Sequence, residues 1–319
     1  MRYAKIIGTG SHLPKKVLTN QDLEKMVDTS DEWTVSRSGI KERRIVSDEE
    51  GTIDLVYHAA LKAIESSKID PQSLDLILVG TTSPDMIFPS TACILQKKLG
   101  LNEIPAFDLQ AACSGFIYAM TVANSFIQSG MYNNILVIGA DTVSRFIDYT
   151  DRGTCVLFGD GAGAVVLSAS DEVGIIGCEI HADGSGVAAL NVGGRLDSGK
   201  VKGNPFMIME GQAVFKMAVR NLAKVAESLL AKTGYTKQQL NWLVPHQANI
   251  RIIESTANHL NIPMDKVIVT VDRHGNTSAG SVPLALDEGV RLGKIKPGDL
   301  VMLEGVGAGF TWGAVLLKF

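Results

Sequence analysis

The chain has 319 residues, of which 45% are hydrophobic and 20% charged, and its four cysteines form no CxxC pair. This composition is globular, and the length allows either one large domain or two fused ones. A formal net charge of −4 argues against a general nucleic-acid-binding protein, and the cysteine spacing argues against a metal site or a redox motif.

The chain starts with a short apolar strand, MRYAKIIGTGSHLP, that is punctuated by glycines. This strand lacks the long apolar core of a signal peptide, and no later segment approaches the length of a membrane span. Free cysteines fit a reducing compartment. We therefore expect a cytoplasmic protein with no membrane partner.

Short apolar runs alternate with helical segments along the chain. The runs that indicate strands buried on both faces are residues 75–80, 106–109, 135–139 and 300–303. Ser90 can cap a helix that Gly100 ends, and another helix extends over about residues 113–128. This alternation predicts an α/β fold with largely parallel sheets.

Cys113 follows the second of these strands and precedes an apolar helical run, in the segment AACSGF. Its sulfur is therefore expected at a helix N-terminus, where unpaired backbone N–H groups stabilise a thiolate. A buried, inert cysteine fits the same local pattern at least as well. Cys93 lies in a helical apolar pattern, and Cys155 and Cys178 lie in strand-like runs, so we expect these three to be structural.

Two glycine-rich segments follow in the middle of the chain. The segment GDGAG at 159–163 resembles a dinucleotide fingerprint, but a strand-like run, AVVLSAS, follows it where a helix should begin. We expect a hairpin turn there instead. Residues 183–205 are rich in Gly, Asn and Asp and are expected to form a long surface excursion, a candidate cover for an active site.

Polar residues at the ends of predicted elements mark the second half. His246 ends a strand-like run in LVPHQAN, a position that suits chemistry and an ordinary hydrogen-bonded histidine about equally. Asn276 precedes a helix in RHGNTSAG, where capping is the common function of asparagine. The segment GVGAG at 305–309 could expose backbone N–H donors to an oxyanion or form a tight turn.

The order of strand, helix, strand with polar turn, helix and strand occurs in both halves. Pattern alone leaves a duplication and ordinary α/β alternation about even. We expect two halves, 1–170 with Cys113 and 171–319 with His246 and Asn276.

Several motifs together are specific: AACSGF, VPHQANIR, DRHGNTSAGSVP, DTSDEWTVSRSGI, DRGT, FGDGAGA and GAGFTWG. With these motifs the chain resembles, from end to end, the β-ketoacyl-acyl carrier protein synthase III family, the initiating condensing enzymes of bacterial type II fatty acid synthesis. The resemblance implies a duplicated thiolase-like fold in five layers, α-β-α-β-α, with two mixed, mostly parallel sheets. It also implies a homodimer that uses acyl-CoA and malonyl-acyl carrier protein as substrates and has no cofactor.

The resemblance also assigns roles to residues. Cys113 resembles the acylated nucleophile, and His246 and Asn276 resemble the donors to the enolate that forms when malonyl-carrier protein loses CO2. Backbone N–H groups of Cys113 and of the turn at Ala308 would hold the tetrahedral oxyanion. Phe88 matches the aromatic residue that reaches across the dimer and closes a pocket for a short acyl group such as acetyl.

Further residues are implied to contact CoA and the carrier protein. Trp33 and Arg152 match the pair that stacks on the adenine of CoA, and Thr29, Arg37 and Asn249 match nearby contacts. The implied docking residues for the carrier protein are Gln247, Ala248, Asn249, Ile250, Arg251 and Lys216. On the helix that carries Lys216, Arg220 and Lys224 extend a basic stripe, which is either part of this surface or a solvated face.

Three other functions are alternatives, although the last of them would not need all three polar residues. A specialised thiolase-like acyltransferase would keep Cys113, His246 and Asn276 but take another second substrate. A Cys-His-Asn hydrolase would release free acid without malonyl-carrier protein. A non-catalytic acyl-CoA-binding module would never acylate Cys113. The resemblance favours the initiating condensing enzyme over all three.

Overall fold

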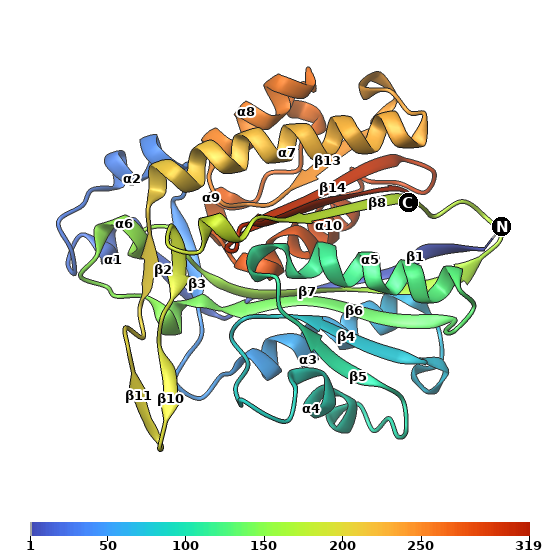
Figure 1. The fold of residues 1–319 in the computed structure, drawn as a ribbon, viewed down its shortest axis with the longest axis horizontal. Helices are drawn as coiled ribbons and strands as arrows, with labels where there is room; N and C mark the ends of the chain where they lie inside the picture. Colours follow the sequence, from blue (N-terminus) through green and yellow to red (C-terminus); the bar gives the residue numbers. More distant parts are fainter. Residues whose placement is uncertain (1) are drawn as a thin grey trace.

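Two stacked β-sheets form the centre of the protein in the computed structural model, which describes residues 2–319 (Figure 1). The first sheet has the strand order β1-β7-β6-β4-β5. Its strands are β1 (Tyr3–His12), β4 (Leu76–Gly80), β5 (Ala106–Leu109), β6 (Asn134–Thr142) and β7 (Asp160–Ser170). The second sheet has the order β13-β14-β15-β8. Its strands are β8 (Ile175–Ala182), β13 (Trp242–Pro245), β14 (Leu300–Gly307) and β15 (Thr311–Lys318).

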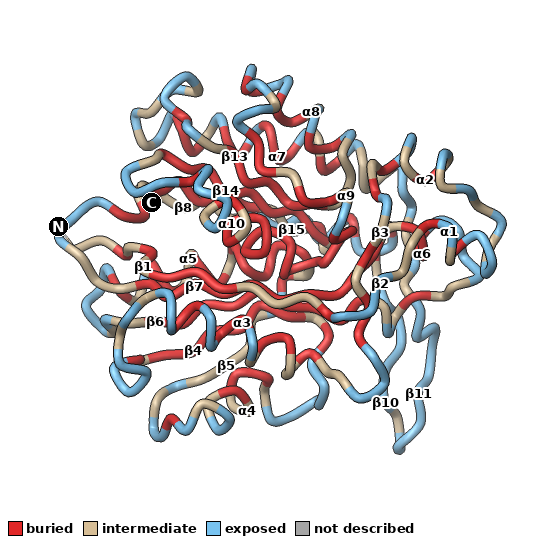
Figure 2. Tube along the Cα trace, turned by 180° about the vertical axis from the view of Figure 1, so that it is seen from behind, coloured by how far each residue is buried: buried red, intermediate tan, exposed pale blue. Residues whose placement is uncertain are grey.

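Helices cover and separate the two sheets. The outer face of the first sheet carries α3 (Thr52–Ser67) and α4 (Thr91–Lys98), and that of the second carries α7 (Gly211–Thr233) and α8 (Ile250–Leu260) (Figure 1). Between the sheets lie α5 (Gly115–Gln128) and α10 (Ser281–Arg291), which contact both. Burial is concentrated in this central region (Figure 2). The expected five-layer α-β-α-β-α architecture is confirmed.

The two halves repeat the same topology. In the first, the spatial order β1-β7-β6-β4 ends with β5, and in the second the order β8-β15-β14-β13 ends with an isolated parallel bridge between Leu243 and Val267. Cys113 and Asn276 thus lie in equivalent turns, each before one of the two central helices. The internal echo in the sequence is therefore a duplication.

Both sheets are mixed, as expected, but the expectation that they are mostly parallel is wrong. The pairs β4–β5, β4–β6 and β13–β14 are parallel, and the other four neighbouring pairs of the two sheets are antiparallel. Parallel pairing was expected from long apolar runs. Here helices cover both faces of each sheet, so antiparallel strands are buried as completely as parallel ones and carry the same pattern.

Two local expectations are also wrong. Residues 159–163 do not form a hairpin turn but lead into strand β7. Their glycines serve packing, because a Cβ atom on Gly163 would lie 2.6 Å from the backbone nitrogen of Leu284 in α10. Cys155 lies in the short helix α6 (Arg152–Cys155), not in a strand. Cys93 in α4 and Cys178 in β8 are placed as expected.

Smaller elements complete the fold. They are β2 (Lys16–Thr19), β3 (Glu42–Ile45), α1 (Asn20–Leu23), α2 (Asp31–Ser38) and α9 (Val271–His274). Residues 183–205 form the expected surface excursion. At its base β9 (Leu190–Val192) pairs with β12 (Met207–Met209), which follows the excursion. Within it β10 (Arg195–Asp197) pairs with β11 (Lys200–Lys202) in a projecting ribbon (Figure 1). No helix within residues 2–319 has both the length and the hydropathy to cross a bilayer.

Candidate active site

Cys113 lies in a 3₁₀ turn, Ala112–Ser114, between the end of β5 and the start of α5. Two glycines let the helix and the neighbouring strand touch, since a Cβ atom on Gly80 would lie 2.5 Å from the carbonyl carbon of Gly115. This close approach fixes the turn against the carboxyl end of the first sheet. The Cys113 side chain is thereby buried, and the residue is only 9% exposed.

His246 and Asn276 come from the second half of the chain, and both are buried. His246 directly follows β13, and its Nδ1 lies 2.5 Å from the hydroxyl oxygen of Ser281. Asn276 Oδ1 accepts the backbone N–H of Ser278 at 2.9 Å. Among residues 2–319, no hydrogen-bond partner reaches His246 Nε2 or Asn276 Nδ2. Each residue is thus held by one polar atom and keeps the other for a ligand.

A pocket of about 640 Å³ brings the three residues together. Cys113, His246 and Asn276 line its buried end, and exposed residues such as Arg37 and Arg152 line its mouth. One wall is formed by α7 and by the β9–β12 pair at the base of the surface excursion. The excursion therefore closes one side of the pocket, whereas its ribbon projects away from the body of the protein.

Burial controls the protonation of Cys113 and His246. Burial raises the pKa of the Cys113 thiol to about 12, the hydrogen bond from Ser278 acts in the opposite direction, and the Asp141 carboxylate raises the pKa further. Burial also lowers the pKa of His246 to about 4. At neutral pH the thiol is protonated and the imidazole is neutral. Burial therefore opposes the thiolate stabilisation expected from the helix N-terminus, and that stabilisation stays a prediction.

The turn that precedes α10 is anchored to the first half of the chain. Asp141, at the end of β6, accepts the backbone N–H of Ala279 on Oδ2 at 3.1 Å. Its Oδ1 accepts four hydrogen bonds from residues 81–83. The hydroxyl of Ser278 donates to Cys113 Sγ at 3.3 Å. Sequence analysis missed Asp141 and Ser278, because it singled out only Asn276 in the polar segment NTSAGS and these contacts depend on the tertiary structure.

The glycine turn after β14 lies directly against Cys113. A Cβ atom on Gly307 would lie 2.6 Å from the backbone nitrogen of Cys113, so only glycine permits this approach. The hydroxyl of Thr311 donates to the carbonyl oxygens of Ala111 at 2.8 Å and Ala308 at 3.1 Å, which joins the two turns. Gly307 lines the pocket, and Ala308 follows it. The backbone at Cys113 and at Ala308 thus belongs to two adjacent, tied turns.

The residues expected to bind CoA gather at the mouth of the pocket with one exception. Those that line it are Trp33, Arg37, Arg152 and Asn249. Thr29 lies outside the lining, and its hydroxyl bonds to that of Thr34 at 3.2 Å. The Arg152 guanidinium stacks directly on the Trp33 ring, 4.9 Å from its centroid. An adenine can enter between them only if Arg152 moves outward.

The expected docking motif is only partly available to a partner. Gln247 is fully buried, so its assignment to docking is wrong. Its amide makes four internal hydrogen bonds, to Pro245 O, Ile268 O, Thr270 N and Val271 N. Asn249 caps α8 and donates to the carbonyl of Arg37, and Ile250 is half-buried against the body of the protein. Ala248 lines the pocket.

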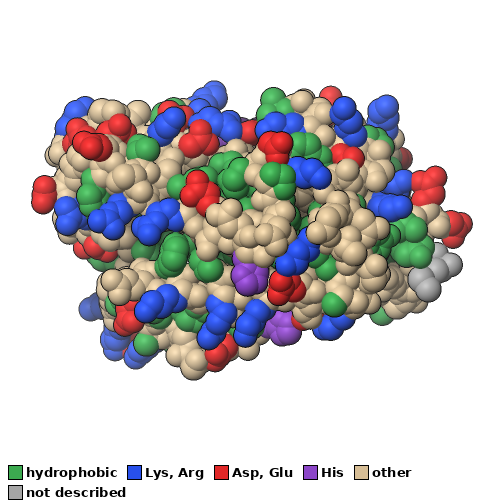
Figure 3. Space-filling model, turned by 90° about the horizontal axis from the view of Figure 1, so that it is seen from above, with side chains coloured by type: hydrophobic (Ala, Val, Ile, Leu, Met, Phe, Trp, Pro, Cys, Tyr) green, Lys and Arg blue, Asp and Glu red, His purple; other side chains and the backbone are tan. Residues whose placement is uncertain are grey.

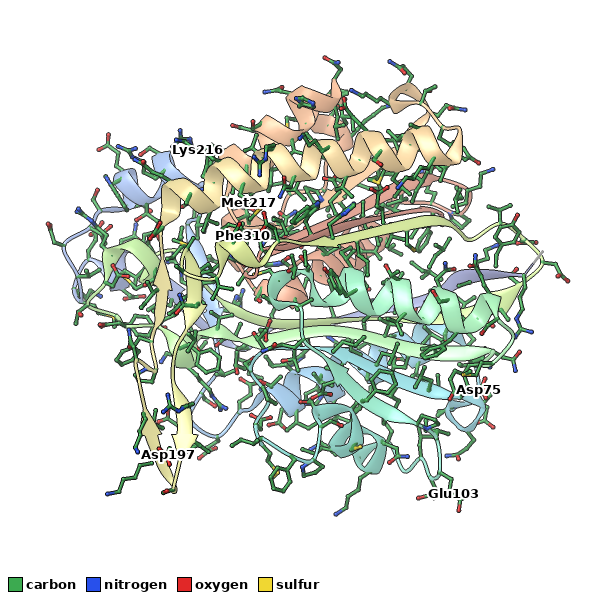
Figure 4. The ribbon with its side chains drawn as sticks, viewed as in Figure 1. Asp75, Glu103, Asp197, Lys216, Met217 and Phe310 are labelled. Atoms are coloured by element: carbon green, nitrogen blue, oxygen red, sulfur yellow. The ribbon has the colours of Figure 1, made fainter. Side chains whose placement is uncertain are left out.

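The exposed basic residues lie on α7 and α8. Arg251 stacks on Phe215, with 5.5 Å between guanidinium and ring centroid. Lys216 points away from the body on α7, whereas the adjacent Met217 points inward toward Phe310 (Figure 4). Arg220 and Lys224 are also exposed on α7. Figure 3 looks onto this side of the molecule and shows Lys and Arg side chains spread across it.

Phe88 does not line the pocket of its own chain. It is 83% exposed, in the loop before α4. Its assignment to an acyl pocket across a dimer stays a prediction. Among residues 2–319, no group of three His, Cys, Asp or Glu side chains could hold a metal ion.

Known proteins resemble the chain over its whole length. Residues 107–184 match the family described as 3-Oxoacyl-[acyl-carrier-protein (ACP)] synthase III, and residues 230–319 match its C-terminal part. The Beta-ketoacyl-[acyl-carrier-protein] synthase III of Laribacter hongkongensis is 57% identical over 319 residues, which cover 100% of both chains. That of Neisseria gonorrhoeae is 57% identical over 320 residues, again with 100% of both chains covered.

Solved structures agree. The 3-oxoacyl-[acyl-carrier-protein] synthase III of Aquifex aeolicus superposes with a TM-score of 0.94 at 48% identity, and the match covers 99% of this chain and 100% of that one. The shared thiolase-like fold and the identity over the full length leave one conclusion. The chain belongs to the β-ketoacyl-[acyl-carrier-protein] synthase III family, the acyltransferases that carry out the initiating condensation of fatty acid synthesis.

Proposed function

We propose that this protein takes an acyl group, acetyl in the first instance, from acyl-CoA onto Cys113. It then condenses this group, with decarboxylation, with malonyl-acyl carrier protein to give a 3-oxoacyl-acyl carrier protein. The supporting observation is a single pocket that leads from Trp33 and Arg152 to a buried thiol flanked by two free donors. The CoA thioester is a substrate here, not a cofactor.

In the first step, the sulfur of Cys113 attacks the thioester carbonyl of acyl-CoA. The tetrahedral oxyanion accepts the backbone N–H groups of Cys113 and Ala308, in the two tied turns. The carbon–sulfur bond to CoA then breaks, and the proton lost by Cys113 ends on the departing CoA sulfur. Loss of one oxyanion donor typically slows such a step by ~10²–10³.

In the second step, malonyl-carrier protein loses CO2 and becomes an enolate. Its oxygen accepts hydrogen bonds from His246 Nε2 and Asn276 Nδ2, neither of which has a hydrogen-bond partner within residues 2–319. A neutral imidazole carries Nε2–H when its Nδ1 accepts the Ser281 hydroxyl, which lies at 2.5 Å. The enolate carbon attacks the acyl carbonyl, and Cys113 leaves as a thiolate and takes up one proton from solvent.

The two steps can be separated with His246→Ala. This variant should still gain an acyl group on Cys113 from acetyl-CoA, because the enolate forms only later. It should release no CO2 from malonyl-carrier protein. His181→Ala is the matched control, since His181 stacks on Trp312 outside the pocket and both steps should continue. A His246→Ala protein that cannot be acylated would overturn this division of roles.

We propose that Arg251 and Lys216 dock the acidic carrier protein at the pocket mouth. Both are exposed, cationic and part of the lining of this pocket. Arg251→Glu should raise the apparent KM for malonyl-carrier protein and leave acyl-CoA loading unchanged. Lys294→Glu makes the same charge change at an exposed site beyond α10 and should alter neither. Equal damage to both steps in Arg251→Glu would argue against docking.

We propose a homodimer formed along β5 and the loop before α4. β5 is an edge strand that is only half-buried, and Met86, Ile87 and Phe88 are 54%, 71% and 83% exposed. An unpaired edge beside an apolar patch is typical of an interface. In this arrangement Phe88 would enter the partner's acyl pocket and limit it to short groups.

Sedimentation velocity tests the dimer. Ile87→Asp should shift the protein from dimer to monomer, because it places a charge in the apolar contact. Leu292→Asp, at an equally apolar and 63% exposed site elsewhere, should leave the dimer intact. A wild-type protein that sediments as a monomer, or an Ile87→Asp dimer of unchanged affinity, would refute this interface.

We also place the boundary between the two halves at residues 170 and 171, between the end of β7 and the start of β8.

The free thiols of all four cysteines support a reducing compartment, and we propose that the protein is located in the cytoplasm.

A further inference from the structure

Ser278 lies against the nucleophile although the two residues are 165 positions apart in the chain. Its hydroxyl donates to Cys113 Sγ at 3.3 Å, and both groups are buried. Among residues 2–319, the hydroxyl has no other hydrogen-bond partner. The backbone of Ser278 has φ of 51°, in the left-handed region that is costly for residues other than glycine.

The surrounding structure holds Ser278 in this conformation. Its backbone N–H donates to Asn276 Oδ1 at 2.9 Å, and the next N–H, from Ala279, donates to Asp141 Oδ2 at 3.1 Å. Both donors are backbone N–H groups, so neither contact depends on the side chain at 278. A glycine would make them with less strain. What serine adds is the hydroxyl, whose one hydrogen-bond partner within residues 2–319 is the reacting sulfur.

We propose that the Ser278 hydroxyl is a further donor of the reaction, one that stabilises the Cys113 thiolate. A hydrogen bond to an ionised acceptor is roughly twice as strong as one to a neutral acceptor, so this bond favours the thiolate over the thiol. The hydroxyl keeps its own proton throughout. It would act twice, before Cys113 attacks acyl-CoA and again when the thiolate leaves at the end of condensation. The inference deepens the nucleophile role proposed above for Cys113.

Few other side chains near Cys113 can stabilise its thiolate. The titratable groups near the thiol are Asp141, from the end of β6, and His246, from the end of β13. The negative charge of Asp141 raises the pKa of Cys113. His246 is neutral at pH 7, because burial lowers its pKa to about 4. Glu304 of β14 lies on the opposite face of its strand from Gly307, which faces Cys113. Ser278 is thus the side chain that opposes desolvation.

The test is the alkylation rate of Cys113 by iodoacetamide in the full chain, followed from about pH 6 to 9 and mapped by peptide mass. Ser278→Gly removes the hydroxyl and suits the left-handed backbone. We expect Cys113 alkylation in this variant to be about tenfold slower at every pH, which corresponds to a pKa raised by about one unit. Ser278→Cys keeps a weak donor and should fall between glycine and wild type.

Ser114→Ala is the matched control. Its hydroxyl lies in the same turn as Cys113 but donates to the carbonyl of Thr311 at 3.0 Å and not to sulfur. Alkylation in this variant should match wild type. A folded Ser278→Gly protein that alkylates at the wild-type rate would overturn the proposal, and so would equal slowing in Ser114→Ala. Iodoacetamide needs no acyl-CoA, so a failed acylation by acetyl-CoA would count against the proposed function and not against this donor.

Discussion

Asp141→Asn tests how the two halves of the protein hold the active-site turn in place. The carboxylate is fully buried at the end of β6 and joins residues 81–83 to Ala279, in the turn before α10. In the variant, the amide oxygen can still accept the bonds from residues 81–83. The amide NH2 must then face the N–H of Ala279, where a donor meets a donor.

The expected cost follows from this single contact. A lost hydrogen bond to a charged group costs about 1.5–3 kcal/mol. For a chain of this size, about 2 °C of Tm corresponds to each kcal/mol, so we expect Tm to fall by about 3–6 °C. The turn also positions Asn276 and Ser278. A displacement of about 1 Å there should slow condensation by about 10²-fold.

Differential scanning calorimetry and a condensation assay measure the two effects. Asp75→Asn is the control, because Asp75 accepts the backbone N–H groups of Asn133 at 2.7 Å and Asn134 at 2.9 Å, within the first half only. It should lose stability but condense normally once folded. A wild-type Tm in Asp141→Asn, or an equal loss of condensation in Asp75→Asn, would refute the reasoning.

Three further results are expected. Trp33→Ala should raise the KM for acyl-CoA by about three- to thirtyfold, because the stacking on adenine is lost. Alkylation of Cys113 by iodoacetamide should stay unchanged, and an unchanged KM would exclude Trp33 from the CoA site. Thr311→Val removes the hydroxyl that is hydrogen-bonded to the carbonyl oxygens of Ala111 and Ala308. The rates of both steps should therefore fall with little change in KM, and a change in KM alone would contradict this. Because the pKa of Cys113 is about 12, its alkylation should rise about tenfold per pH unit between about pH 6 and 9, and a plateau near pH 7 would show a far lower pKa.

The position of Cys113 could be predicted from local sequence. An apolar run, small residues and a second apolar run mark a strand, a turn and a helix, and the structure has these elements within about two residues of the expected bounds. The convergence with His246 and Asn276 could not be derived this way. It depends on the duplication, which brings equivalent turns of the two halves together, and periodicity carries no information on which elements become neighbours.

Other features depend on tertiary contacts that the sequence does not display. The glycines at 159–163 look like a turn, yet Gly161 and Gly163 let α10 approach β7, and Gly159 lies against the carbonyl of His274. Gln247 lies in a polar motif that suggests an exposed docking surface. Its side-chain amide is instead buried and hydrogen-bonded to backbone groups inside the protein. The raised pKa of Cys113 has the same origin, since packing around the pocket removes water from a thiol whose local sequence suggests easy ionisation.

The most direct measurement is the intact mass of the protein after mixing with acetyl-CoA, and again after malonyl-carrier protein is added. We expect an acetyl adduct that maps to Cys113 and disappears as acetoacetyl-carrier protein forms. Absence of any adduct on Cys113 with acetyl-CoA and with longer acyl-CoAs, or release of free acid before malonyl-carrier protein is added, would contradict Cys113 as the nucleophile of a condensing enzyme.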